Sequence, residues 1–121
     1  MKLDSLKKRY FSLDSKVEIY LPSRTVNHDA LAPTLLNDWR IQLGKKMAEL
    51  FGGATITTAM GFYENSTLNA CQLEDVQIIY SYSPKLEPKS IREVIKLAES
   101  MKVALEQESV MIVINGTALF V

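Results

Sequence analysis

The chain has 121 residues, of which 47% are hydrophobic and 23% are charged, as in one globular domain rather than a disordered segment. Fourteen basic residues balance fourteen acidic ones, which argues against nucleic acid as a partner, and no apolar run is long enough to span a membrane. A single cysteine and the absence of a signal-peptide pattern predict a cytoplasmic protein, and we expect no metal or other cofactor.

Residues 1–15 are predicted to form an N-terminal arm outside a single α+β domain at residues 16–121. Apolar side chains recur in the arm at spacings of three and four, with basic residues at positions 7–9 between them. This spacing fits a short amphipathic helix, although a solvated arm is the simpler interpretation.

The first strand and the first long helix follow the arm. Residues 16–21 (KVEIYL) alternate apolar and polar side chains as in a half-buried strand, which Pro22 ends. From Thr34 to Phe51 the apolar period changes to three and four, which predicts a helix with Thr34 as its N-cap.

Two adjacent glycines, Gly52 and Gly53, follow this helix in the stretch LFGGAT. A helix often ends on a glycine in the left-handed conformation, whereas a phosphate-binding glycine loop usually precedes a helix. Neither common phosphate-binding glycine pattern is present. We therefore interpret the pair as a C-cap and a sharp turn into the next strand.

The middle of the chain carries two strand patterns. Residues 54–65 are rich in β-branched and aromatic residues, and residues 74–83 form a second run of this kind, closed by Pro84. The polar residues between them, 64–73, are predicted to form a connecting loop.

The clearest helical pattern covers residues 87–109, and two apolar runs then flank Asn115 and Gly116. Asn-Gly is the strongest short hairpin signal, because a type I′ turn needs positive φ at both positions. The resulting order β-α-β-β-α-β-β matches the ferredoxin-like βαββαβ plan. In this plan two helices cover one face of an antiparallel sheet, and here a C-terminal hairpin adds a strand at an edge.

The sequence contains few candidate catalytic or ligand-binding residues. His28 stands beside Asp29 in the loop after the first strand, where a surface histidine is the simpler interpretation, and Cys71 lacks a cationic neighbourhood in the sequence. No carboxylates are spaced as metal ligands. The residues that could together bind a small anion are Arg24, Asn27, His28, Gly52, Gly53 and Thr55.

Aromatic side chains on the predicted strands indicate a contact surface. RNA-recognition motifs stack bases on such side chains, but their basic-glycine-aromatic signature is missing from VQIIYSYS. A subunit interface suits rings with a polar tip better. The predicted interface residues are Tyr20, Tyr63, Tyr80, Tyr82, Leu119 and Phe120.

Four segments together resemble a family of small bacterial proteins without an established activity: KVEIYLPS, LFGGATITTAMGFYEN, EDVQIIYSYSP and LEQESVMIVINGTALFV. Members share an FGGAT turn and a terminal N-G-type hairpin, and many are carried by plasmids, phages and other mobile elements. The resemblance covers residues 16–121 and implies a cytoplasmic protein of a mobile element or its host. It supplies no catalytic residue.

From these observations we predict a non-enzymatic, self-associating accessory protein that binds a partner protein or a small ligand. An open sheet face would otherwise expose apolar side chains, so we expect a homo-oligomer. Two alternatives stay open. One is a module that binds a nucleotide-like anion at a subunit boundary, and the other is a small enzyme that uses His28 as an acid or base.

Overall fold

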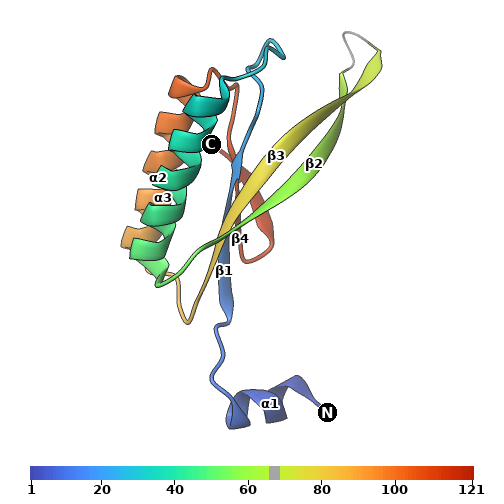
Figure 1. Cartoon of the computed structure of the whole chain (residues 1–121). Helices are drawn as coiled ribbons and strands as arrows, with labels where there is room; N and C mark the ends of the chain where they lie inside the picture. The colour runs from blue at the N-terminus through green and yellow to red at the C-terminus, as the bar shows by residue number, and fades with distance from the viewer. Residues whose placement is uncertain (66–68) are drawn as a thin grey trace.

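Five antiparallel strands, with two long helices packed on one face, form the body of the protein (Figure 1). The computed structural model describes residues 1–65 and 69–121, and it confirms the mixed α+β class. The strand order is β2-β3-β1-β4-β5. The elements are α1 (Leu3–Arg9), β1 (Ser15–Leu21), α2 (Pro33–Phe51), β2 (Thr55–Asn65), β3 (Ala70–Ser83), α3 (Pro88–Ala104), β4 (Met111–Ile114) and β5 (Thr117–Phe120). No helix in these ranges is long and apolar enough to cross a membrane.

The core lies between the sheet and helices α2 and α3. Alternate residues of β1 point toward the helices and are buried, as the period of a strand requires. They meet the apolar stripes of the two helices, and each fully buried aliphatic side chain contributes about 1.5–3 kcal/mol. The central members of this cluster are Val17, Ile19, Leu21, Leu43, Met47, Val94 and Met101.

The ends of α2 give one confirmed and one wrong prediction. Gly52 is the C-cap, with φ of 94° and its N–H donated to the carbonyl of Ala48. Thr34 is not the N-cap, because the helix begins at Pro33 and Ala32 occupies the cap position without a side-chain hydrogen bond. Proline fits the first helical position, where its missing N–H costs nothing.

The predicted loop at residues 64–73 is for the most part wrong. Strand β2 continues to Asn65 and β3 begins at Ala70, so the two form a long hairpin that extends past the helices (Figure 1). Residues 66–68 lie outside the described residues. None of the described helices covers this part of the hairpin, which suits the exposed polar side chain of Glu64 (Figure 1).

The closing hairpin forms where the Asn-Gly pair predicted it. Asn115 and Gly116 have φ of 49° and 84°, and Ile114 pairs with Thr117 across the turn. Asn115 also ties the turn to β1, since its side-chain oxygen accepts the N–H of Lys16. Helix α3 ends at Ala104, earlier than predicted.

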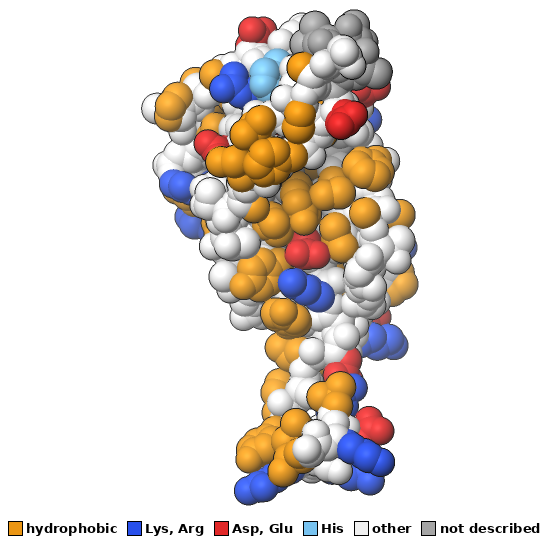
Figure 2. Space-filling view, turned by 90° about the vertical axis from the view of Figure 1, so that its right-hand side faces the viewer, with side chains coloured by type: hydrophobic (Ala, Val, Ile, Leu, Met, Phe, Trp, Pro, Cys, Tyr) orange, Lys and Arg blue, Asp and Glu red, His pale blue; other side chains and the backbone are white. Residues whose placement is uncertain are grey.

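The face of the sheet away from the helices is largely apolar. Cross-strand partners place Tyr20 beside Ile78, and Glu18 beside both Tyr80 and Val113. Figure 2 shows this face, with hydrophobic side chains gathered at its centre around few charges. We call it the open face, defined by Lys16, Glu18, Tyr20, Val76, Ile78, Tyr80, Tyr82, Val113 and Phe120.

Candidate functional site

The loop between β1 and α2 is held by hydrogen bonds on two sides. Within the loop, Arg24 and Ala30 form an isolated antiparallel β-bridge. The N–H of Leu31 is donated to the carbonyl of Ser23. From the segment after α3, the Gln107 amide donates to the carbonyl of Arg24 at 2.6 Å. These contacts give the loop a defined shape and let it present side chains in fixed positions.

Glu74, on β3, is fastened to the start of this loop. Its Oε1 accepts the backbone N–H groups of Ser23 and Arg24, both at 2.9 Å. Hydrogen bonds to a carboxylate are the stronger kind, so they hold both the side chain and the turn. Within the described part of the chain, Oε2 has no hydrogen-bond partner and is available to a ligand.

Tyr63 reaches the same loop from β2. Its hydroxyl lies 3.1 Å from Nδ1 of His28, and the two rings meet edge to face. His28 has φ of 65°, an uncommon conformation for a residue other than glycine, and its carbonyl accepts the Arg24 guanidinium at 3.1 Å. A left-handed histidine at a hydrogen-bonded junction marks this loop as a candidate site.

The electrostatics of the junction favour the neutral phenol. Burial raises the pKa of Tyr63 above its ordinary value, the nearby Glu74 carboxylate raises it further, and Arg24 opposes them. Tyr63 therefore keeps its proton at neutral pH and is able to donate a hydrogen bond. We call Arg24, His28, Tyr63 and Glu74 the junction cluster.

A groove opens beside the junction cluster on the helix side of the sheet. It has a volume of about 540 Å³ and lies between the first turns of α2 and the strands β2 and β3. A smaller hollow of about 180 Å³, lined in part by Arg24 and Glu74, adjoins it. The two share Ser23 and Asp75, so together they form one concave surface.

The structure separates the predicted anion-binding residues into two groups. Arg24 and His28 belong to the junction cluster, and Asn27 is exposed in the same loop. The turn from Gly52 to Thr55 lies at the other end of β2, about 26 Å from Tyr63 at roughly 3.3 Å per residue. Within one copy of the chain the two groups do not converge.

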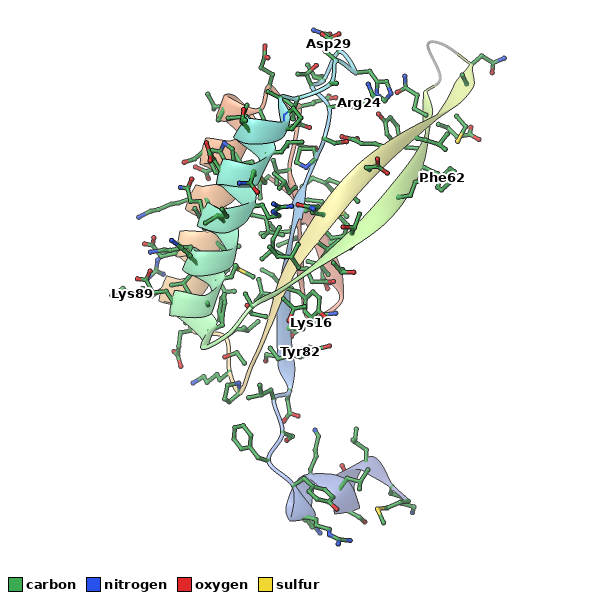
Figure 3. The ribbon with its side chains drawn as sticks, viewed as in Figure 1. Lys16, Arg24, Asp29, Phe62, Tyr82 and Lys89 are labelled. Atoms are coloured by element: carbon green, nitrogen blue, oxygen red, sulfur yellow. The ribbon has the colours of Figure 1, made fainter. Side chains whose placement is uncertain are left out.

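The predicted interface residues lie mostly on the open face, with Leu119 on the opposite side of edge strand β5. Figure 3 places Tyr82 and Lys16 far from Arg24 along the sheet. Lys16 lies over the rings of Tyr80 and Tyr82, at 4.7 and 5.4 Å from their centres. Whether these side chains meet a second copy stays a prediction.

Sequence reasoning missed Glu74 and the role of Tyr63. The sequence pattern predicts Tyr63 only as an interface residue and gives Glu74 no role. No local pattern links either residue to the loop, because their partners lie 35 to 51 positions away. Cys71 is exposed. Within residues 1–65 and 69–121 there is no group of three or more His, Cys, Asp or Glu side chains that could hold a metal ion.

Two solved structures share this fold over most of their length. A phage SAM lyase in complex with S-methyl-5′-thioadenosine has a TM-score of 0.62 and 15% identity, over 88% of this chain and 88% of that chain. The phage SAM lyase in its apo state has a TM-score of 0.64 and 14% identity, over 93% and 92%. No family model and no curated protein matches the sequence.

These structures contradict the prediction of a non-enzymatic accessory protein, because both neighbours are an enzyme. The prediction rested on the shape of the sheet and on a resemblance that carries no activity. Neither feature reports on a site whose members are brought together only by folding. The two solved structures do not bear on the resemblance to the FGGAT family.

Proposed function

We propose that this protein is an enzyme that cleaves S-adenosylmethionine and releases S-methyl-5′-thioadenosine. The observation that carries the proposal is the likeness to the phage SAM lyase over 88% or more of both chains, in one case with that compound bound. A fold alone hosts many functions. The junction cluster and its adjoining groove add a concave surface with convergent polar groups, where small molecules usually bind.

The proposal includes the ferredoxin-like plan of the domain. The order β2-β3-β1-β4 places β1 and β3 at the centre, and α2 and α3 lie on one face (Figure 1). Strand β5 then extends the sheet past β4, and α1 lies outside the plan. This assignment makes the loop after β1 and the β2–β3 hairpin neighbours at one end of the sheet.

The chemistry requires no water and no external redox partner. When the bond between the sulfonium and the four-carbon amino-acid chain breaks, its electron pair passes to sulfur, and the cation becomes a neutral thioether. In the same step, either the fragment's own carboxylate captures the carbon that loses sulfur, or the adjacent carbon gives a proton to a basic group of the site and a double bond forms. Both routes neutralise charge, so a site that excludes water favours them.

The junction cluster suits the binding of a nucleoside with an attached charged chain. The unengaged Oε2 of Glu74 can accept hydrogen bonds from ribose hydroxyls or an ammonium group, and its orientation is fixed by the turn. Tyr63, held in its protonated form, donates a hydrogen bond without adding charge. Such preorganised groups stabilise a transition state because they need not reorient during reaction.

The test is to incubate the purified chain with S-adenosylmethionine and follow the products by liquid chromatography and mass spectrometry. We expect S-methyl-5′-thioadenosine in many-fold excess over protein, together with a four-carbon fragment that has gained no water. The heat-denatured protein provides the control. Product no faster than in that control would refute the proposal, and a fragment that is already hydrated at the earliest time points would show hydrolysis instead of a lyase reaction.

We also propose that copies of the chain associate through the open face. Its centre combines tyrosines with Ile78 and Val113, and within the described residues helices cover only the opposite face. The replacement Val113→Lys places a charge there without touching the core. We expect light scattering to give more than one chain for the wild type and a smaller mass for the variant; a monomeric wild type would contradict this.

A further inference from the structure

Two opposite charges face the groove from its two walls. Arg40 comes from the second turn of α2, and Asp75 comes from β3. In the described part of the chain, neither side chain forms an ion pair with another residue. The Arg40 guanidinium donates to the side-chain oxygen of Asn37, three residues earlier on the same helix, and this neutral partner leaves its charge uncompensated.

The rest of the lining makes these charges effective. Leu21, Pro33 and Leu36 supply apolar surface near them, while Thr58 and Gln77 add neutral polar groups. Apolar walls keep water away and strengthen the interaction of a fixed charge with a ligand. A groove of this kind favours a ligand that carries both a carboxylate and an ammonium group over a simple anion or cation.

The groove also leads to the proposed site of reaction. Asp75 and Ser23 line both the groove and the hollow that contains Glu74. A ligand with its charged end between Arg40 and Asp75 can therefore extend along Ser23 to the junction cluster. The volume of about 540 Å³ lies within the range of small-molecule sites, roughly 300–1,000 Å³.

We infer that the groove binds the α-amino acid end of the substrate, with Arg40 donating to its carboxylate and Asp75 accepting from its ammonium group. The inference rests on the proposed function and gives it an orientation, with the nucleoside toward the junction cluster. Arginine is suited to this role because its planar fork matches a carboxylate. Both residues then act as substrate-binding residues that fix where the sulfonium lies.

The experiment measures binding by calorimetry with three ligands that have no sulfonium to cleave. S-adenosylhomocysteine carries the carboxylate and the ammonium, its decarboxylated form carries only the ammonium, and S-methyl-5′-thioadenosine carries neither. The variants are Arg40→Gln and Asp75→Asn. Lys45→Gln and Asp38→Asn are matched controls, because they remove the same charges from exposed positions of α2 that do not line the groove.

We expect Arg40→Gln to weaken the binding of S-adenosylhomocysteine about 10- to 50-fold and to leave the affinities for the other two ligands unchanged. Asp75→Asn should weaken both ammonium-bearing ligands, and the control variants should resemble the wild type. Melting curves of all variants show whether each is folded before binding is measured.

Two results would overturn the inference while the proposed function stands. One is a wild type that binds all three ligands, with Arg40→Gln and Asp75→Asn binding them equally well. The other is an equal loss for all three ligands in a folded Arg40→Gln variant, since a carboxylate contact cannot affect a ligand without one. A wild type that binds none of the three overturns the inference, and if it also fails to cleave S-adenosylmethionine, the proposed function falls with it.

Discussion

At one end of the sheet, the loop after β1 meets the β2–β3 hairpin through charged and polar side chains. At the other end, the turn from Gly52 to Thr55 lies among apolar and aromatic side chains, including Phe11 and Tyr82. The glycine turn is the more conspicuous of the two in the sequence. Its first glycine serves the backbone by ending a helix, whereas the inconspicuous loop holds a carboxylate, a phenol and an imidazole together. The conspicuous pair of glycines therefore has a structural role, whereas the candidate site is formed by residues that do not stand out in the sequence.

The largest expected effect concerns Glu74 at the polar end. Glu74→Gln keeps an oxygen that accepts the N–H groups of Ser23 and Arg24 but removes the charge. We expect kcat/KM for S-adenosylmethionine to fall about 100-fold, equivalent to about 2.7 kcal/mol, with little change in melting temperature. Initial rates of S-methyl-5′-thioadenosine release measure it. Full activity in this variant would remove Glu74 from the site.

A smaller effect is expected at the phenol. Tyr63→Phe deletes only the hydroxyl that contacts His28 and should lower kcat/KM about 10-fold. Tyr82→Phe is the matched control at the far end of the open face, and its rate should equal that of the wild type. If both variants lose activity equally, the distinction between the two ends of the sheet fails.

Substitutions in the glycine turn should change the stability of the protein and leave its activity unchanged. Gly52→Ala forces a side chain into the left-handed conformation and should cost about 1 kcal/mol in the free energy of unfolding. The neighbouring Gly53 is not in that conformation and has open space around it, so Gly53→Ala should change stability by less than about 0.5 kcal/mol. Urea unfolding compares the two. A loss of activity in a folded Gly53→Ala variant would restore a functional role to the turn.

The smallest expected effect is a loss of folding stability in strongly alkaline solution, where Tyr63 ionises. The fold raises the pKa of Tyr63 from its ordinary value of 10.0, so the neutral phenol stabilises the folded state below that value. This contribution is lost as the pH rises through the higher pKa of the folded protein. The difference in tyrosinate absorbance between wild type and Tyr63→Phe follows the titration. In the Glu74→Gln background the pKa should be lower, because the neighbouring negative charge is gone.

The sequence by itself determined the features that depend on neighbours along the chain. Periods of two and of three to four residues predicted the α+β class, and Gly52 and Asn115–Gly116 marked a helix end and a hairpin through their backbone preferences. The tertiary structure alone decided which side chains meet. Glu74 contacts a turn 50 residues earlier in the chain, and Arg40 faces Asp75 across a groove, because strand register and helix placement join distant segments. Local periodicity carries no information about such pairs, so the candidate site could be found only in the folded chain.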